Sequence, residues 1–526
     1  MSFAKVYSAQ TSLLKPYTVD IEVDLSNGLH AFSVVGLGDK AVDESKDRIS
    51  AAIKNSGFGF KSPKNKNQKV VVSLAPADIK KEGPIFDLAI ALAYLLASEE
   101  IEFDPKKKLF LGELSLDGEV RKINGVLPLV DYAKKRGFEE VYLPAQNAKE
   151  GALIEGISIF AVNTLKDAIN HLHHGETIGK EENEKPHSKI ELSPQEKTEV
   201  EYKDEEFSVD FADIKGQEGA KRGLEIAAAG GHNLAMFGPA GTGKTMLAKA
   251  FAHVLPPLTF PEILETTGIH SVAGSLKDTL VTHPPFRSPH HTSSYVSLVG
   301  GGTYPKPGEI TLAHRGVLFL DEFPEFERRV IDSLRQPLEE RVVSISRAKG
   351  STLFPANFIL IAAMNPCPCG NYGIQGKQCI CSPIHIERYK RKVSGPIVDR
   401  IDLWIEVSKV EHEKLSKKSA TGVTTKELRE KIVKARKIQA KRFKGNKRDI
   451  KTNSEMGVKD LEKYVALSEP VIDILNQSAR TLDLSARSYH RLIKLSRTIA
   501  DLENSEEIAP EHLYEALQYR PKRIAS

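Results

Sequence analysis

The chain reads NLAMF over Asn233–Phe237 and then GPAGTGKT over Gly238–Thr245. The first run is a short apolar stretch of the kind that forms a buried parallel strand. The second fits the pattern G-x-x-x-x-G-K-[ST], whose glycines let backbone N–H groups turn inward around phosphate oxygens, where a Cβ would interfere. A helix that begins at Lys244 adds the positive end of its dipole. Strand, loop and helix in this order predict a parallel α/β sheet with a phosphate-binding loop at its edge.

The loop carries the side chains that a nucleoside triphosphate needs. Lys244 would reach the β- and γ-phosphates, and the hydroxyl of Thr245 would ligate Mg²⁺. A chance glycine-rich turn could share these letters, but the strand before it and the helix after it favour the nucleotide site. We expect the phosphates to be cradled by Gly238, Pro239, Ala240, Gly241, Thr242, Gly243, Lys244 and Thr245.

Two more polar sites follow apolar runs further along the chain. The stretch Val317–Glu322 reads VLFLDE, four strand residues and then two carboxylates, and Asn365 comes directly after FILIAAM. Ligands bind at the carboxyl ends of strands in such sheets. Asp321 is therefore expected to hold Mg²⁺ and Glu322 to polarise the attacking water, while Asn365 orients that water or contacts the γ-phosphate. Alone, the carboxylates would indicate a solvated strand end and Asn365 a turn.

All four cysteines of the chain lie within 15 residues, in the pattern C-x-C-x₉-C-x-C. Four thiolates this close can close a tetrahedral site, and sulfur ligands favour zinc. The spacing departs from the common C-x₂-C pair, and free thiols or a disulfide are the alternatives. We expect Cys367, Cys369, Cys379 and Cys381 to hold a structural Zn²⁺ that braces the loop after Asn365.

Length and composition bound the protein class. A chain of 526 residues is too long for one core, and its net charge of +4 is too small to demand a nucleic-acid partner, so such binding would need local basic patches. The longest apolar run, Leu88–Ala97, is about half of a membrane span and predicts a buried helix. Clustered cysteines differ from a secreted disulfide framework. We expect a reduced, cytoplasmic protein without membrane contact.

The composition changes along the chain and suggests a multidomain α/β protein. Residues 1–175 mix strand-like and helix-like runs and are expected to form one domain. Residues 176–206 are polar and rich in Glu and Lys, which predicts a linker. Residues 207–410 alternate strands and helices and should form the nucleotide-binding core. Residues 411–526 are expected to form a helical lid.

These motifs resemble the magnesium-chelatase-like branch of AAA+ ATPases, and most closely the ComM/YifB family of competence-related DNA motors. The resemblance covers nearly the whole chain. Besides the phosphate loop, it rests on PFRSPHHTSS (285–294), GEITLAHRGVLFLDEFPEF (308–326), RQPLEE (335–340), AAMNPCPCG (362–370), SGPIVDRIDL (394–403) and LSARSYHRLIKLSRTIADLE (484–503).

The resemblance implies roles for two arginines. Arg400 would be the arginine finger that reaches the γ-phosphate of a neighbouring subunit, and Arg487 would be the second sensor on the helical lid. Arg491, one helical turn further on, is the alternative second sensor. A guanidinium fork neutralises charge on a transferring phosphoryl group, although an ordinary arginine forms a surface salt bridge. A finger acting in trans implies a ring, and related motors suggest six subunits.

The stretch Arg341–Pro355 reads as strand, glycine-containing turn and strand, which predicts a hairpin. It resembles the pore hairpin of ring helicases. Arg347 and Lys349 near its tip would contact a phosphate backbone without sequence preference, although a solvated tip is the plainer interpretation. An insertion over residues 262–312 places Arg287, His290 and His291 as further pore candidates. The basic run Lys431–Lys451 is either a DNA contact or a solvated helix face.

Residues 1–175 resemble the Lon-protease-like domain at the N-terminus of ComM proteins. Ile85 follows Gly83-Pro84 where a Lon peptidase has its serine, and Leu127 stands where the lysine would align. No Ser-Lys chemistry is available at these positions, so we expect a non-catalytic module for DNA contact or ring assembly. Lys61, Lys64, Lys66 and Lys69 form either a basic edge or an exposed loop.

The resemblance implies a hexameric, ATP-driven ring motor that acts on DNA as a helicase or in branch migration, during recombination or natural transformation. ATP and Mg²⁺ would be its cofactors, and recombination proteins its further partners. The alternative is the motor subunit of a magnesium-chelatase-type complex, which normally lacks a Lon-like domain. An ATP-dependent protease is disfavoured because the Ser-Lys pair is missing.

Overall fold

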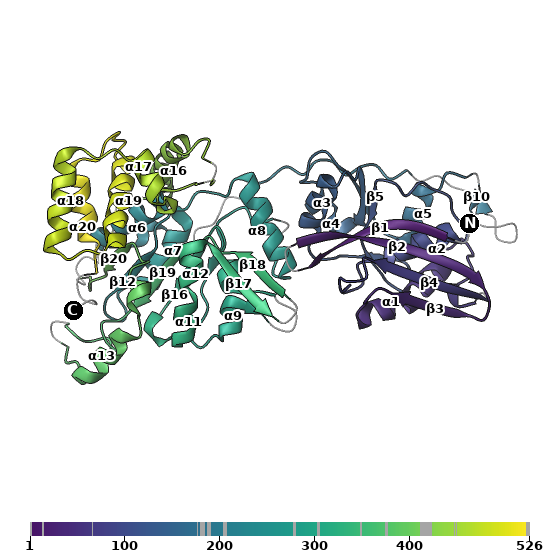
Figure 1. Ribbon diagram of the computed structural model, residues 1–526, viewed down its shortest axis with the longest axis horizontal. Coiled ribbons are helices and arrows are strands. Elements are labelled where there is room, and N and C mark those ends of the chain that lie inside the picture. Colours follow the sequence, from purple (N-terminus) through teal and green to yellow (C-terminus); the bar gives the residue numbers. More distant parts are fainter. Residues whose placement is uncertain are drawn as a thin grey trace. The chain divides into compact units, whose positions relative to one another are not determined.

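The computed structural model describes residues 3–12, 15–65, 67–175, 177–178, 185–186, 191–202, 208–276, 280–301, 306–347, 350–373, 377–410, 423–446, 448 and 450–521. The chain forms two compact units (Figure 1). The first comprises Met1–Glu201 and Ile263–Val281, and the second comprises Tyr202–Glu262 and Thr282–Ser526. Part of the expected insertion, Ile263–Val281, thus packs with the first unit. None of the helices in the described ranges is long and apolar enough to cross a bilayer.

The first unit is built on a seven-stranded sheet of order β3-β4-β2-β1-β5-β8-β9. Strands β1, β2 and β4 pair antiparallel, and the remaining neighbours pair in parallel. Alternate residues of β2 are buried, as a strand with one covered face requires. The strands are β1 (Phe3–Ser12), β2 (Lys15–Asn27), β3 (Ala31–Val35), β4 (Gln68–Ala75), β5 (Lys108–Phe110), β8 (Glu140–Pro144) and β9 (Ser158–Val162).

The apolar run Leu88–Ala97 forms the central helix of the first unit. Helix α2 (Asp87–Ala97) has apolar residues on all sides and all but one of its residues are buried, which is how such a helix avoids water. A small hairpin of β6 (Glu113–Leu114) and β7 (Val120–Arg121) lies against it. The other helices of this unit are α1 (Lys40–Asn55), α3 (Val126–Lys135), α4 (Ala145–Gly151), α5 (Leu165–Leu172) and most of α8 (Phe260–Val272).

The expected polar linker contacts the first unit where the structure describes it. The backbone N–H of Gln195 donates to the carbonyl of Ile159 at 2.7 Å, and that of Thr198 donates to Ala152 at 3.2 Å. Pro194 and Gln195 therefore lie along β9, and Thr198 lies against the end of α4, in spite of the polar composition of this segment, because backbone hydrogen bonds need no apolar side chain.

The second unit contains a five-stranded sheet of order β13-β16-β19-β12-β20, in which every neighbouring pair is parallel. The apolar runs identified in the sequence form its three central strands, with both faces covered. Its strands are β12 (Leu234–Phe237), β13 (Phe286–Arg287), β16 (Val317–Leu320), β19 (Ile359–Met364) and β20 (Leu403–Glu406). The helices of this core are α6 (Glu218–Gly230), α7 (Lys244–Val254), α10 (Glu309–Leu312), α11 (Arg328–Ser333), α12 (Arg335–Glu340), α13 (Pro383–Arg391) and α14 (Gly395–Val398).

The predicted hairpin is present. Strand β17 (Val342–Arg347) pairs antiparallel with β18 (Gly350–Pro355), so that Val342 lies opposite Pro355 and Arg347 opposite Gly350. The insertion before the Asp-Glu strand forms α8 (Phe260–Val272), α9 (Tyr295–Val299), β14 (Gly300–Gly301) and β15 (Lys306–Pro307).

The C-terminal part of the second unit is helical, as expected. It comprises α16 (Thr425–Arg442), α17 (Val458–Tyr464), α18 (Glu469–Thr481), α19 (Ala486–Leu502) and α20 (Pro510–Gln518). The basic run Lys431–Lys451 begins in α16, where Ile432 and Ala435 are buried. The guanidinium of Arg436 donates to the carbonyl of Ala228 at 2.7 and 3.1 Å. Part of the run therefore holds the helices together and is unavailable to another partner.

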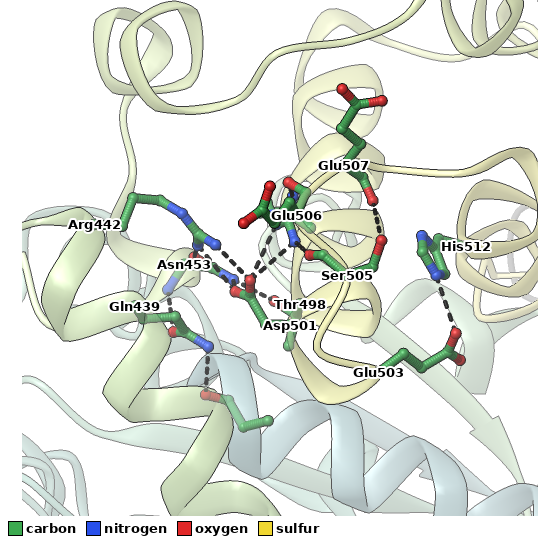
Figure 2. A network of polar contacts seen from close by, with 12 residues as sticks. Gln439, Arg442, Asn453, Thr498, Asp501, Glu503, Ser505, Glu506, Glu507 and His512 are labelled. Carbon is green, nitrogen blue, oxygen red and sulfur yellow. Dashed lines mark hydrogen bonds and ion pairs between the residues drawn. The ribbon is translucent and has the colours of Figure 1, made fainter.

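A buried polar network fixes α19 relative to α16 (Figure 2). The carboxylate of Asp501 has no exposed side-chain surface and is neutralised by Arg442 and Arg497. Asn453 donates to the same carboxylate at 2.8 Å, and Gln439 donates to a carbonyl of α6 at 3.2 Å. A buried charge is tolerated only with such partners. The network fixes the orientation of α19, which carries Arg487.

Candidate nucleotide-binding and hydrolysis site

The loop between β12 and α7 needs its glycines for two reasons, backbone conformation and close packing. Gly241 and Gly243 have φ angles of +78° and +88°, in the left-handed region that favours glycine. A Cβ on Gly238 would lie 2.1 Å from the carbonyl oxygen of Val407, which follows β20. The loop is thus pressed against the neighbouring strand, and its backbone N–H groups lie at the N-terminus of α7, where anions bind.

Lys244 lies inside this loop with only 7% of its surface exposed. Its ammonium donates to the carbonyls of Gly238 and Pro239, each at 2.8 Å, and to the side-chain oxygen of Asn365 at 3.1 Å. Burial lowers the pKa of this lysine, and the nearby Asp321 opposes that effect. All three accepting oxygens are uncharged, so the positive charge remains available to an anionic ligand.

The two carboxylates follow β16, which is separated from β12 by one strand, β19, in the sheet order. The hydroxyl of Thr245 donates to Asp321 at 2.9 Å, so the two expected Mg²⁺ ligands are in contact. Glu322 has a φ of +51°, a conformation that is costly for glutamate and typical of functional sites. Its carboxylate lies 3.1 Å from Nδ1 of His291.

The pore position considered for His291 stays a prediction, and the structure adds that this residue contacts Glu322. The guanidinium of Arg287, in the same motif, forms a bidentate pair with Glu309 at 2.6 and 2.7 Å, and its pore position also stays a prediction. The sequence shows a His pair ahead of the Asp-Glu strand, but it does not show that His291 contacts Glu322.

Asn365 directly follows β19. This strand lies between β12, which leads into the phosphate loop with Lys244, and β16, which leads into Asp321. The parallel register aligns Phe237 with Met364 and Leu320 with Ala362, so the residues that follow all three strands emerge at one edge of the sheet. The side chains predicted from separate motifs therefore converge around the phosphate loop.

Arg400 and Arg487 lie at the opposite edge of the sheet. Asn233, just before β12, accepts from the backbone N–H of Asp402 at 2.8 Å and donates to the carbonyl of Arg400 at 3.3 Å. Arg400 and Arg487 share one partner, Glu339 at the end of α12. Glu339 accepts from Arg487 at 2.9 Å and forms an ion pair with Arg400. The two arginines are thus held side by side, away from the phosphate loop of their own chain.

Arg491, the alternative second sensor, has a different environment. Its guanidinium donates to the carbonyl of Ile401 at 2.6 Å and to the hydroxyl of Ser488 at 3.1 Å, and burial lowers its pKa. The side chain of Arg487 is 54% exposed. Of the two, Arg487 is the one open to a ligand, and Arg491 fastens α19 to the loop before β20.

The four cysteines come together at the phosphate-loop edge of the sheet. Their sulfur atoms all lie within 4.8 Å of one another, and each cysteine is a free thiol. The Sγ atoms of Cys367, Cys369 and Cys379 are separated by 3.4, 3.8 and 3.6 Å.

The expected DNA contacts are described only in part. Lys349 lies outside the described residues, and Arg347 is described as the last residue of β17. On the basic loop of the first unit, Lys64 forms an ion pair with Asp47, and Lys66 also lies outside the described residues.

Three protein-family descriptions match this chain. Residues 21–147 match the subunit ChlI of Mg-chelatase, residues 210–415 match the magnesium chelatase subunit ChlI, and residues 422–520 match the C-terminal part of that subunit. The second and third ranges include the phosphate loop and α19.

Several curated proteins are similar over nearly their whole length. The competence protein ComM of Haemophilus influenzae is 42% identical over 522 residues, which cover 99% of this chain and 98% of that protein. The protein YifB of Escherichia coli is 37% identical, with 99% and 97% covered. The DNA repair protein RadA of Streptococcus pyogenes is similar to this chain over a shorter range, with 36% identity over 93 residues. These residues cover 18% of this chain and 20% of RadA.

Proposed function

Since the chain belongs to the ComM/YifB family of magnesium-chelatase-like AAA+ proteins, we propose that it is an ATP-hydrolysing ring motor that acts on DNA. The single observation that carries the ATPase proposal is the convergence of Lys244, Thr245, Asp321, Glu322 and Asn365 at one sheet edge.

In the proposed reaction, the phosphate loop binds the triphosphate and Lys244 exchanges its carbonyl partners for phosphate oxygens. Thr245 and Asp321 would hold Mg²⁺, which neutralises charge on the β- and γ-phosphates when it is bound. Their hydroxyl and carboxylate oxygens are the hard ligands that Mg²⁺ prefers. The proposed cofactors are thus ATP with Mg²⁺, and a structural Zn²⁺ at the four cysteines.

The attacking water would be polarised by Glu322 and oriented by Asn365. The contact between His291 and Glu322 supports a positioning role for the imidazole, because it fixes a carboxylate that is otherwise half-exposed. The left-handed backbone at Glu322 directs the carboxylate toward this partner at a local conformational cost.

The ring is proposed from the position of the two arginines. Arg400 lies at the strand end opposite the phosphate loop of its own chain, and Glu339 pairs with both Arg400 and Arg487. A subunit that offers its phosphate loop on one side and two arginines on the other suits a head-to-tail interface, which closes into a ring. Six subunits, with Arg400 as the finger and Arg487 as the second sensor, are proposed from the family resemblance.

DNA is proposed as the substrate on two grounds. The hairpin of β17 and β18 resembles the pore hairpins of ring helicases, and the names of two relatives refer to competence and DNA repair. Helicase or branch-migration activity in recombination or natural transformation, with recombination proteins as further partners, fits these names. Arg347 and Lys349 are the proposed contacts to the DNA backbone.

A chelatase motor is the second candidate, because all three family descriptions name a magnesium-chelatase subunit. In that case the hairpin would act on a partner protein and DNA would have no effect on ATP turnover. The two candidates share the nucleotide site and differ in what stimulates it.

The first unit is proposed to be a Lon-like, non-catalytic module for DNA contact or ring assembly. Ile85 and the buried Leu127 offer neither a nucleophile nor a base at the aligned positions. We propose domain limits of 1–175, 176–206, 207–410 and 411–526, and a cytoplasmic location. Four cysteines that stand as thiols suit a reducing compartment.

ATP hydrolysis measured with single-stranded, duplex and branched DNA tests this proposal. We expect stimulation that weakens with added salt, since phosphate contacts release counterions. Glu322→Gln protein serves as the control for contaminating ATPases. A protein that stays monomeric with ATP and turns over no nucleotide, with or without DNA, would contradict the motor. ATP turnover that ignores every DNA but responds to a chelatase partner complex would favour the second candidate.

A further inference from the structure

The four sulfur atoms have the spacing of a metal site. A tetrahedral ion with zinc–sulfur bonds of about 2.3 Å places its ligands about 3.8 Å apart. The described sulfur pairs are separated by 3.4, 3.6 and 3.8 Å, whereas a disulfide would bring two sulfurs to about 2 Å. Three of the sulfurs thus have the spacing of ligands around one ion, and the sulfur of Cys381 lies within 4.8 Å of each of them.

Backbone groups complete the surroundings of the sulfurs. The N–H of Tyr372 donates to the sulfur of Cys367 at 3.3 Å. Such outer hydrogen bonds orient metal ligands and offset the charge of thiolates. Four thiolates around a divalent cation carry a net charge of −2, and a backbone N–H donor such as that of Tyr372 stabilises the negative sulfur that it contacts.

The cysteine loop lies directly on the nucleotide site. Gly370 is in the left-handed region, and a Cβ built on it would lie 3.6 Å from Cβ of Ala240 in the phosphate loop and 4.0 Å from Cγ of Asn365. Asn365, the residue that contacts Lys244, therefore lies beside the cysteine loop.

Regular secondary structure does not stabilise the described part of the cysteine loop. Between Met364, where β19 ends, and Pro383, where α13 begins, the described residues form neither helix nor strand. Ligation of one ion by four side chains would supply the cross-links that a hydrogen-bond ladder supplies elsewhere.

We propose that Cys367, Cys369, Cys379 and Cys381 bind one Zn²⁺ ion, and that the metal-bound loop positions Asn365 and the phosphate loop for hydrolysis. Removal of the ion leaves the cradle and Lys244 able to bind nucleotide but lowers the turnover rate. The metal site follows from the cysteines alone, and its effect on turnover rests on the proposed ATPase function.

Metal content tests the first half. All four cysteines of the chain belong to the cluster, so a thiol titration reports on this site alone. We expect one zinc per chain, and four thiols that react with a disulfide reagent only after the ion is removed. Cobalt substitution should give the intense thiolate-to-metal absorption of a four-sulfur site. Less than about half an equivalent of zinc after purification without chelator would overturn the site.

Nucleotide kinetics test the second half. Cys379→Ser, or wild-type protein stripped with a chelator, should bind a fluorescent ATP analogue within about threefold of normal while kcat falls about 10–100-fold, the usual effect of disturbing a metal's supporting shell. Adding Zn²⁺ back to stripped wild-type protein should restore kcat. Ile380→Ser is the matched control, because this side chain lies between two ligands but is 85% exposed.

The outcomes separate the two claims. Zinc that is present but can be removed without lowering kcat would overturn the positioning role and leave the motor intact. A zinc-loaded protein that hydrolyses no ATP under any condition would overturn the proposed function while the metal site stands. If Cys379→Ser does not fold, as judged by thermal unfolding, the stripped and reloaded wild-type protein decides.

Discussion

Replacing Arg400 by alanine is expected to abolish ATP turnover while leaving ATP binding intact. The guanidinium lies beyond the start of β20, and the phosphate loop lies beyond the end of β12. In register, Leu234 is paired with Leu403 and Phe237 with Glu406. The four-residue strand β20 spans about 13 Å at about 3.3 Å per residue, which is longer than an arginine side chain.

This separation fixes both the size and the sign of the effect. Arg400 cannot reach the γ-phosphate bound by its own subunit, so its removal leaves the nucleotide contacts of each isolated chain unchanged. In the assembled ring, loss of an arginine finger costs about 10³–10⁵ in rate. ATP affinity should therefore stay near that of the wild type, whereas kcat should fall by at least about 10³.

Mixing two inactive variants provides the assay. Arg400→Ala subunits keep a complete phosphate site, and Glu322→Gln subunits keep the arginine. Where the two meet in the right order, an active site is restored. A one-to-one random mixture forms such interfaces at about a quarter of positions in a head-to-tail ring, so about a quarter of wild-type turnover should return.

Failure of the mixture to recover turnover, although both variants assemble, would refute the trans arrangement. So would an Arg400→Ala protein with normal kcat. The control is Arg391→Ala, since Arg391 is 77% exposed and forms a local ion pair with Glu387 one helical turn away. Its removal should change neither turnover nor binding.

Lys244→Ala should raise the Kd for ATP at least about 100-fold, because a buried cation with three neutral acceptors is lost, and retained micromolar affinity would contradict the site. Glu322→Gln should bind ATP normally and slow single-turnover hydrolysis about 10²–10⁴-fold. Glu339→Gln should lower kcat about tenfold at unchanged ATP affinity, because both arginines lose their anionic anchor. Burial favours a higher pKa for Asp402, but the hydrogen bond from His232 and nearby cations hold the pKa below its usual value. The stabilisation is thus present above the unfolded pKa of about 3.9 and lost as pH falls through the folded pKa. Asp402→Asn should therefore destabilise the second unit by about 1–3 kcal/mol at pH 7 in urea unfolding and by progressively less below pH ~4.

The sequence determined the nucleotide site in outline. Buried parallel strands are continuous apolar runs, and the residues that follow them sit at one sheet edge, so the phosphate loop, the Asp-Glu pair and Asn365 could be predicted to meet. The hairpin Arg341–Pro355 and the buried helix at Leu88–Ala97 were also predicted correctly, because turns and all-apolar helices have local signatures. The catalytic roles and the domain limits stay predictions.

Only the tertiary structure decided which separate motifs touch. In the structure, His291 contacts Glu322, and Glu339 pairs with both Arg400 and Arg487. Arg491 donates to a backbone carbonyl, whereas the side chain of Arg487 is exposed. The tertiary structure also sets Gly370 of the cysteine loop against the phosphate loop. Periodicity and motif spacing report what one segment does along the chain. Contacts between segments that are far apart in the sequence depend instead on strand order, register and helix packing, which no local pattern encodes.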